Sequence, residues 1–194
     1  MKTNIILAGV GGQGILTIAA VLDTAALAND LNLKQSEVHG MSQRGGAVQS
    51  HVRISDTEIH SDLIPQGKAD IIISVEPMEA LRYLPFLKKD GYLVTDSNPF
   101  ENIPNYPNME ELYNEIKLVP NSILIDAKKI AKDLVNSKAT NIVLLGAASS
   151  LLPLDEESLI QAIKSLFQRK GDRVVNKNIE AFNKGKEIAT GILS

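Results

Sequence analysis

The sequence has no cysteine among its 194 residues. This absence excludes disulfides, cysteine-ligated iron–sulfur clusters and thiolate catalysis within the polypeptide. Basic residues are not in excess, because 20 Lys and Arg stand against 23 Asp and Glu, and they form no stripe that would bind nucleic acid. No apolar run approaches the about 20 residues that span a bilayer, and the first run stops at a glycine cluster, too early for a signal peptide. We therefore expect a cytoplasmic protein that binds neither nucleic acid nor membrane.

The apolar residues that are present alternate between the periods of strands and helices. The run Asn4–Ala8 predicts a buried strand, and the spacing from Ile15 to Leu31 predicts a helix. Pro77 is placed to open a helix and Asp155 to cap one. Further strands are expected at 33–38, 70–75, 92–95 and 122–125, and further helices at 110–116, 127–135, 140–152 and near the C-terminus. The pattern predicts one domain over residues 1–194, a three-layer α/β/α Rossmann-like fold with a mostly parallel sheet.

An antiparallel hairpin is expected inside this sheet. Apolar and polar residues alternate over residues 48–54, which predicts a half-buried strand, and a turn at Asp56 can lead into a partner strand ending near Ile59. His51 and His60 would lie on this hairpin, and we expect both side chains to be exposed. Because the three histidines of the sequence show no metal-ligand spacing, we expect no metal site.

A glycine-rich loop satisfies the G-x-G-x-x-G spacing between the first expected strand and helix. Gly9 allows the tight turn, Gly11 lets a ligand approach the backbone, and Gly14 lets the helix pack closely on the strand. Together with Gly12 and Gln13, these residues leave N–H groups at the helix start that favour an anion by roughly 0.3–2 kcal/mol. The alternative is a strand-to-helix turn that binds nothing.

A second loop contains Ser42, Gln43, Arg44, Gly45 and Gly46. Arg44 offers a planar fork for phosphate or carboxylate, and the glycines let backbone amides turn toward the same anion. If both loops follow the carboxyl ends of strands in one sheet, they converge into a phosphate clamp. Alternatively, Arg44 pairs with a carboxylate, for example across a subunit interface, and the glycines only permit the bend. The sequence leaves both readings open.

Two acidic residues also follow expected strands. Glu37 lies near the position where a dinucleotide site places the acid that binds a ribose, which keeps a stand-alone NAD site among the alternatives. Glu76 ends the strand at 70–75, where open α/β sheets place groups that contact ligands. It could accept a hydrogen bond from a ligand or a loop amide, or it could cap its own helix. No arrangement of residues identifies a catalytic group.

These blocks of sequence carry a resemblance to a known family. The sequence resembles the gamma-domain subunits of 2-oxoacid:ferredoxin oxidoreductases, and most closely the small (beta) subunit type of the indolepyruvate ferredoxin oxidoreductases. The HGMSQRGG block is far more specific than the glycine loop. The matching segments cover nearly the whole chain in the family's order: GVGGQGI at Gly9–Ile15, EVHGMSQRGGAVQSHVRI at Glu37–Ile54, ADIIISVEPMEALR at Ala69–Arg82, NIVLLGAASSLL at Asn141–Leu152 and NIEAFNKG at Asn178–Gly185.

The resemblance implies a division of labour between subunits. A larger partner would carry thiamine diphosphate and iron–sulfur clusters, and the complex would convert a 2-oxoacid, coenzyme A (CoA) and oxidised ferredoxin into an acyl-CoA, carbon dioxide and reduced ferredoxin. The indolepyruvate type implies arylpyruvates as substrates. The sequence agrees, because it has neither cysteines for clusters nor a G-D-G…N motif for thiamine diphosphate and magnesium. The isolated chain is expected to be inactive.

The resemblance also implies roles for the two loops. Gly11, Gly12, Gln13, Gly14 and Arg44 would face the phosphates of CoA or the interface with the large subunit. Two other hypotheses remain at this point, namely a stand-alone Rossmann oxidoreductase that uses NAD and a non-catalytic scaffold subunit.

Overall fold

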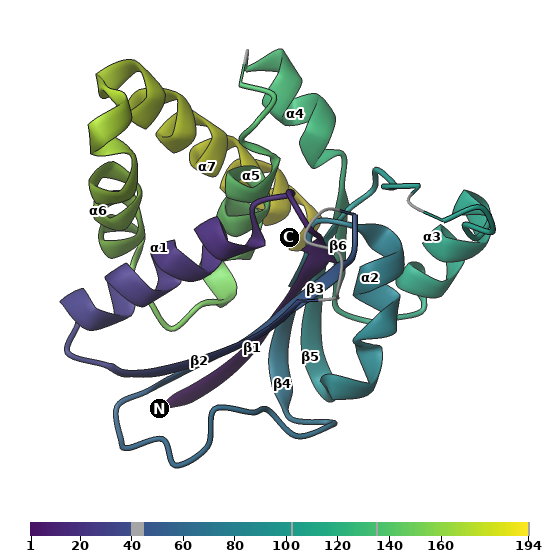
Figure 1. Cartoon of the computed structure of the whole chain (residues 1–194), viewed down its shortest axis with the longest axis horizontal. Helices are drawn as coiled ribbons and strands as arrows, with labels where there is room; N and C mark the ends of the chain where they lie inside the picture. Colours follow the sequence, from purple (N-terminus) through teal and green to yellow (C-terminus); the bar gives the residue numbers. More distant parts are fainter. Residues whose placement is uncertain (40–44, 102, 135, 194) are drawn as a thin grey trace.

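The computed structural model describes residues 1–39, 45–101, 103–134 and 136–193 (Figure 1). Of the candidate site residues, Ser42, Gln43 and Arg44 lie outside the described residues. The described chain contains a sheet with the strand order β2-β3-β1-β4-β5-β6. The strands are β1 (Lys2–Val10), β2 (Asn32–His39), β3 (Ala47–Ser55), β4 (Ala69–Ser74), β5 (Leu87–Asp96) and β6 (Ser122–Ile125).

The sheet is parallel on one side of β1 and antiparallel on the other. β1, β4, β5 and β6 pair in parallel, whereas β3 runs antiparallel to both β1 and β2. β2 therefore runs in the same direction as β1 but is separated from it by one strand. The expected mostly parallel sheet with an antiparallel hairpin is confirmed.

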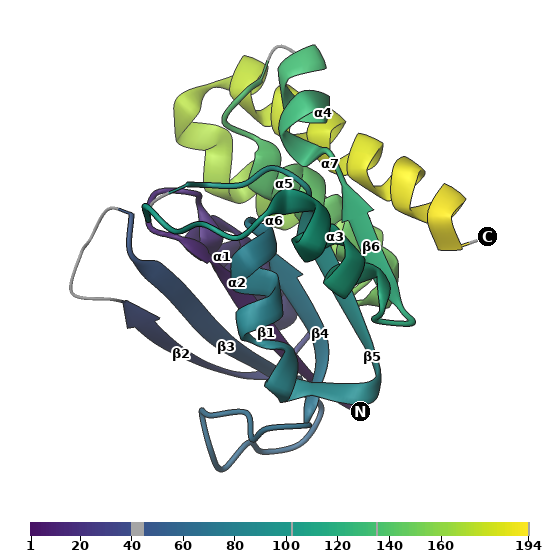
Figure 2. The same cartoon turned by 90° about the vertical axis from the view of Figure 1, so that its right-hand side faces the viewer.

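Helices cover both faces of the sheet (Figure 2). On one face, α1 and α5 contact the strands, while α6 packs on α1 and α7 packs on α5. On the other face lie α2 and α3. The three-layer α/β/α architecture is thus confirmed, with one face two helices deep. The helices are α1 (Ile15–Ala28), α2 (Pro77–Arg82), α3 (Met109–Lys117), α4 (Ala127–Asp133), α5 (Thr140–Ala148), α6 (Glu156–Phe167) and α7 (Asp172–Leu193), with short 3-10 turns at Leu84–Phe86, Ser149–Leu151 and Gln168–Lys170.

The central strand β1 explains how the core is divided. Successive side chains of a strand point to opposite faces, so Ile5 and Leu7 enter the core beneath α1 and α5, while Ile6 enters the smaller core beneath α2. All three side chains are fully buried. A strand with apolar residues on both faces is what a sheet covered on both sides requires.

The hairpin forms elsewhere than the sequence suggested. β3 pairs with β2, not with a strand after Asp56, and residues 56–68 form no strand. Residues 56–68 instead pack over β3 and bury the polar side chains of that strand. Arg53 donates from Nη1 to the carbonyls of Ser61 and Leu63, at 2.7 and 3.0 Å. The prediction of a partner strand ending near Ile59 is therefore wrong.

The same segment makes the prediction of an exposed His51 wrong. Its side chain is buried, and its Nδ1 accepts a hydrogen bond from the backbone N–H of Ile64 at 3.0 Å. Burial, assisted by the charge of Arg53, lowers the pKa of the imidazole, which favours the neutral ring that such a bond requires. His60 is exposed, as expected.

Several boundaries differ from the sequence pattern. Gly91, expected to end a helical segment, lies inside β5, which starts at Leu87. The helix expected over 140–152 ends at Ala148 and continues as a 3-10 turn. Ile192, expected on the buried stripe of α7, is 47% exposed because it lies beyond the packed part of that helix. No helix in the described ranges is long and apolar enough to cross a membrane.

Candidate anion-binding site

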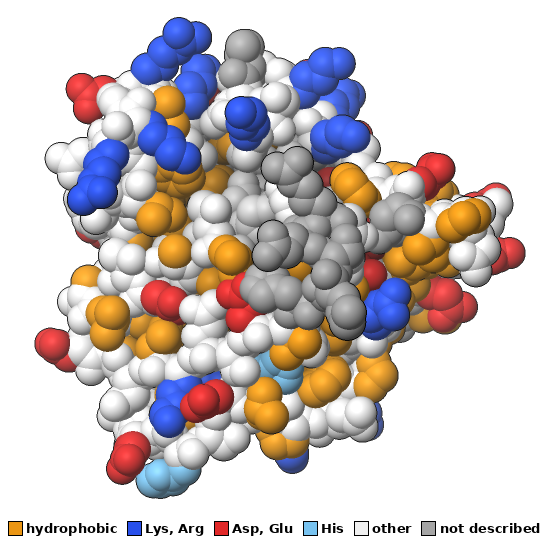
Figure 3. Space-filling view, viewed as in Figure 1, with side chains coloured by type: hydrophobic (Ala, Val, Ile, Leu, Met, Phe, Trp, Pro, Cys, Tyr) orange, Lys and Arg blue, Asp and Glu red, His pale blue; other side chains and the backbone are white. Residues whose placement is uncertain are grey.

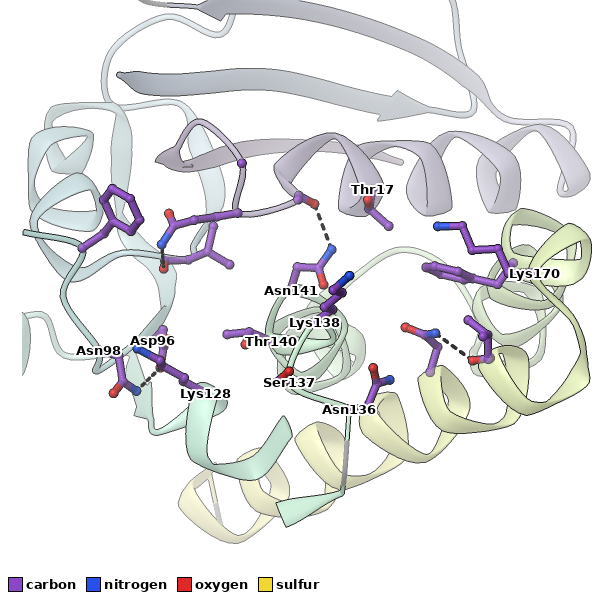
Figure 4. A pocket seen from close by; sticks show the side chains of 18 of the residues that line it. Thr17, Asp96, Asn98, Lys128, Asn136, Ser137, Lys138, Thr140, Asn141 and Lys170 are labelled. Carbon is purple, nitrogen blue, oxygen red and sulfur yellow. Dashed lines mark hydrogen bonds between the residues drawn. The ribbon is translucent and has the colours of Figure 1, made fainter. Parts of the chain in front are cut away.

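A cavity of about 790 Å³ opens where the start of α1 faces the start of α5 (Figure 4). Cavities of this size hold ligands as large as nucleotides. Its walls come from segments far apart in the sequence: the glycine loop, the ends of β4 and β5, the loop before α5, and α7 with the turn that precedes it. The lining residues are Gly12, Gln13, Gly14, Thr17, Val75, Asp96, Asn98, Pro99, Phe100, Lys128, Asn136, Ser137, Lys138, Thr140, Asn141, Phe167, Lys170, Val174 and Asn178.

The two predicted loops meet beside this cavity. The N–H of Gly11 donates to the carbonyl of Gly46 at 2.9 Å, and the N–H of Gly45 points back to the carbonyl of Gly11 at 3.5 Å. These contacts prolong the pairing of β1 with β3 beyond its last ladder residues, Val10 and Ala47. The Gly11 amide is therefore engaged by the chain itself, although the loops converge as the sequence suggested.

The side chain of Gln13 holds the glycine loop in shape. Its Oε1 accepts from the N–H of Val10 at 2.7 Å, and its Nε2 donates to the carbonyl of Val75 at 3.2 Å. Gly9 packs closely beside the Gln13 side chain. A Cβ on Gly9 would come within 2.6 Å of Val75 and 2.9 Å of Ile15. Gln13 thus borders the cavity, but both ends of its amide bond the protein's own backbone.

Two glycines leave the start of α1 open to the cavity. Gly12, with φ +102°, has open space where a Cβ would lie. Gly14, with φ +80°, is the N-cap residue of α1 and provides no side-chain cap. The first N–H groups of a helix have no partner within the helix, and they carry the positive end of its dipole. The first N–H groups of α1 therefore lie at the cavity, although that of Thr17 already donates to the carbonyl of Gly14 at 3.0 Å.

The start of α5 is arranged in the same way. Its N-cap residue, Ala139, offers no side-chain hydrogen bond either. In contrast, α2, α3, α4 and α6 are capped by the side chains of Glu76, Asn108, Asp126 and Asp155. The cap predicted at Asp155 is confirmed. Among the described starts of α1 to α6, those of α1 and α5 have no such cap, and both border the cavity.

Three lysines add positive charge to the cavity wall. Lys128, Lys138 and Lys170 line it, and within the described ranges none of them forms an ion pair with a carboxylate; Lys170 instead lies over the ring of Phe167, 5.3 Å from its centroid. Figure 3 shows Lys and Arg side chains gathered at the end of the molecule formed by α4, α6 and α7. These side chains make this part of the cavity wall positively charged.

One acid, Asp96, lines the cavity among the described residues. Its side chain is 2% exposed and accepts hydrogen bonds through Oδ1 from Asn98 Nδ2 and from the N–H of Ala127, both at 3.0 Å. Burial raises its pKa, and the hydrogen bond from Asn98 opposes that shift. Through its bond to the N–H of Ala127, Asp96 fixes the start of α4 to the end of β5.

Glu76 is a structural anchor rather than a free ligand group. It is fully buried and caps α2 by accepting from the N–H of Glu79 at 2.7 Å. Its other oxygen accepts from the N–H of Phe100 at 3.3 Å and from the hydroxyl of Tyr106. The helix-cap reading is confirmed, and the carboxylate also ties down the segment after β5 whose Phe100 borders the cavity.

The geometry weakens the argument for a dinucleotide site. In a Rossmann site the acid that binds the ribose ends the strand next to β1. Here β3 lies between β1 and β2, so Glu37 is two strands away from the glycine loop. Glu37 pairs in the ladder with Ser50 of β3 and does not border the cavity.

No pattern in the sequence pointed directly to the lysines or to Asn141. They come from loops and helix starts that only the fold brings together. Asp96 could have been found, because it ends an apolar strand at the sheet edge where ligands bind. The block beginning at Asn141 was part of the family resemblance but suggested no role.

The fold agrees with the relationships of the sequence. The chain is 38% identical over 201 aligned residues to indolepyruvate oxidoreductase subunit IorB of Pyrococcus horikoshii, an alignment covering 98% of each protein. Residues 4–188 match the family described as pyruvate ferredoxin/flavodoxin oxidoreductase. The chain belongs to this family. As its resemblance to gamma-type subunits implied, it is a subunit of a 2-oxoacid:ferredoxin oxidoreductase.

Solved structures show the same fold. The gamma subunit of a keto/oxoacid ferredoxin oxidoreductase from Geobacter sulfurreducens has a TM-score of 0.71 and 26% identity, with 97% of this chain and 99% of that one covered. The 2-oxoglutarate:ferredoxin oxidoreductase from Magnetococcus marinus, solved with 2-oxoglutarate, CoA and succinyl-CoA, has a TM-score of 0.79 and 22% identity. The match spans 98% of this chain but 31% of that longer one, and it concerns the fold alone.

Proposed function

We propose that this chain is the small subunit of an indolepyruvate-type 2-oxoacid:ferredoxin oxidoreductase and that its cavity binds the phosphates of CoA. Residues 1–194 would form one gamma-type domain. A large partner subunit would supply thiamine diphosphate and iron–sulfur clusters, oxidise an arylpyruvate and pass electrons to ferredoxin. The absence of cysteine agrees with this division, because the chain cannot hold a cysteine-ligated cluster itself.

One observation supports the CoA part of this proposal above others. Two helix starts without side-chain caps, and three lysines that form no ion pair with a carboxylate in the described part of the chain, border one cavity of about 790 Å³. Backbone N–H groups at helix starts and lysine ammonium groups are the usual donors to phosphate. CoA carries phosphates and is bound in the longer Magnetococcus marinus relative. The role of this chain would be to bind and orient that cosubstrate, while the chemistry takes place on the partner.

The subunit assignment is tested by activity with and without the partner. We expect the isolated chain to show no arylpyruvate-dependent reduction of ferredoxin, and we expect activity when the co-purifying large subunit is added. That subunit should contain thiamine diphosphate and iron–sulfur clusters. Full turnover by the isolated chain would contradict the assignment.

The charge of the cavity is tested in the assembled enzyme. Removing one ammonium group with Lys138→Met should raise the KM for CoA by about 3- to 10-fold, a modest change because the side chain is solvent-exposed. The KM for the 2-oxoacid should stay at its wild-type value. Lys184→Met is the matched control, since Lys184 pairs with Glu187 on α7, away from the cavity, and it should change neither constant. Equal effects of the two substitutions would contradict a phosphate site here.

The NAD alternative predicts a different ligand for the same cavity. Calorimetric titration of the isolated chain with NADH would then show micromolar binding without a partner. We expect no binding, because the acid that would hold the ribose lies two strands from the glycine loop. The scaffold alternative predicts that cavity substitutions leave the KM for CoA unchanged while assembly is intact.

A further inference from the structure

Asn141 connects the two open helix starts. It is the second residue of α5, and its side chain is 5% exposed. Its Nδ2 donates to the carbonyl of Gly14, the N-cap residue of α1, at 2.9 Å. The two residues are 127 positions apart in the sequence. Figure 4 shows this bond spanning the cavity wall between the two helices.

The contact also dictates which residue can stand at position 14. A Cβ on Gly14 would lie 2.6 Å from Nδ2 and 3.2 Å from Cγ of Asn141. The backbone of Gly14 is left-handed, with φ +80°, which disfavours other residues independently. The amide of Asn141 thus occupies the space that a side chain at the helix cap would need, and it fixes the carbonyl on which the cap conformation depends.

The hydrogen bond leaves the N–H groups of both helix starts untouched. Asn141 donates to a carbonyl, so it uses no helix-start donor. The side-chain caps on α2, α3, α4 and α6 do the opposite, because each accepts from a first-turn N–H. A side chain that holds two helix starts together without capping either preserves the donors for a ligand.

We propose that Asn141 is the positioning residue of the anion site. By bonding Gly14, it aligns the starts of α1 and α5 so that the first N–H groups of both helices point at the same phosphate-bearing group. This inference rests on the proposed CoA site. Asn141 itself need not touch the ligand. Its effect is exerted through the direction in which the first N–H groups of α1 point.

The test uses the assembled enzyme carrying Asn141→Leu, which keeps a similar shape but cannot donate. We expect the KM for CoA to rise about tenfold, the size expected for misaligned hydrogen bonds to a charged group. The kcat and the KM for the 2-oxoacid should remain within about twofold of wild type. Ser149→Ala is the control, because it removes a buried hydrogen bond to the Gly146 carbonyl at the other end of α5. It should leave the KM for CoA unchanged.

Hydrogen–deuterium exchange supplies a second measurement that needs no variant. In the wild-type enzyme, CoA should slow exchange at residues 15–18 and at residues 140–143 together. Protection of one helix start without the other would overturn the inference, even if Asn141→Leu fails to fold. An unchanged KM for CoA in folded Asn141→Leu, or an equal rise in Ser149→Ala, would overturn it as well.

The outcomes also separate this inference from the proposed CoA site. If Gly12→Asp raises the KM for CoA and Asn141→Leu does not, the site stands and the positioning role fails. If CoA protects no residue around the cavity and Gly12→Asp has no effect on its KM, the CoA site itself fails.

Discussion

At the scale of single residues, Asp23 on α1 stands out because its charge is poorly accommodated. The residue is half-buried, and its Oδ1 has no hydrogen-bond partner among the described residues. Burial raises its pKa from 3.8 to about 6. Between these values the folded protein binds more protons than the unfolded chain, so stability falls as the pH rises through this range.

Asp23→Asn should therefore stabilise the protein at neutral pH. We expect a gain of about 1–2 kcal/mol at pH 7.5, reduced from the full linkage value because the side chain is partly exposed. The gain should shrink as the pH falls through this range and be mostly lost at pH 4, close to the pKa of 3.8 in the unfolded chain. Urea unfolding of the two proteins at pH 7.5 and pH 4 measures it. Equal stabilities at pH 7.5 would show that Asp23 is solvated.

At this scale, helix caps could be predicted from the sequence, whereas side-chain hydrogen bonds between distant segments could not. Asp155 and Glu76 could be read as helix caps because a cap bonds a residue only three positions away in the sequence. The bonds from Gln13 to Val75 and from Asn141 to Gly14 join segments 62 and 127 positions apart, and no local pattern announces them.

At the scale of elements, two glycines set how closely α5 and α7 pack. A Cβ on Gly146 would overlap the carbonyl of Phe182, and a Cβ on Gly185 would overlap the carbonyl of Val143. Because these contacts involve backbone atoms, neither helix can yield by moving a side chain. These two glycines therefore let α7 pack closely against α5, and α5 in turn forms one wall of the cavity.

Gly185→Ala should destabilise the protein by about 3 kcal/mol or more, through overpacking against a rigid backbone. Gly191→Ala, on the same helix, is the control, since nothing lies within 4 Å of a Cβ there. That substitution should stabilise the helix by up to about 1 kcal/mol. Thermal or urea unfolding compares them, and similar effects at both positions would contradict the close approach of the helices.

The segment after β5 depends on a second contact between elements. The Tyr106 hydroxyl donates to Glu76, and burial together with this carboxylate raises the pKa of the phenol well above its usual value. Tyr106→Phe should lower stability by about 1.5–3 kcal/mol and speed hydrogen exchange at Phe100. Tyr92→Phe removes a hydroxyl that forms no hydrogen bond in the described structure and should be neutral. Unchanged exchange at Phe100 would contradict the anchoring role.

Periodicity predicted most elements and failed where packing replaces regular structure. β6 and the starts of α1, α2 and α4 fall at the expected residues, because their apolar spacing and capping residues are local. The hairpin was misplaced because residues 56–68 bury polar side chains of β3 without forming a strand. The alternation of apolar and polar residues along β3 predicted that one face of the strand is exposed. Only the fold shows that Arg53 and His51 on this face are covered.

At the scale of the whole molecule, the sheet brings distant segments to one edge, where the starts of α1 and α5 border the cavity. The sequence indicated the glycine loop and the family, but not the cavity, because Lys128, Lys138 and Lys170 have no shared motif. Their contribution is electrostatic, and charges near a surface are screened by salt. The KM for CoA in the assembled enzyme should accordingly rise with ionic strength, while the KM for the 2-oxoacid responds less. Equal salt dependence of the two KM values would argue against a contribution of these three lysines to CoA binding.

The central claim is that CoA phosphates meet the start of α1, and Gly12→Asp tests it most directly. The position has open space for a side chain, so the variant places a carboxylate where the phosphate would bind. Gly67→Asp is the matched control, because Gly67 also has a positive φ and open space but lies outside the cavity. We expect Gly12→Asp to raise the KM for CoA at least about tenfold, with the KM for the 2-oxoacid and subunit assembly intact. An unchanged KM for CoA in an assembled Gly12→Asp enzyme would contradict the account.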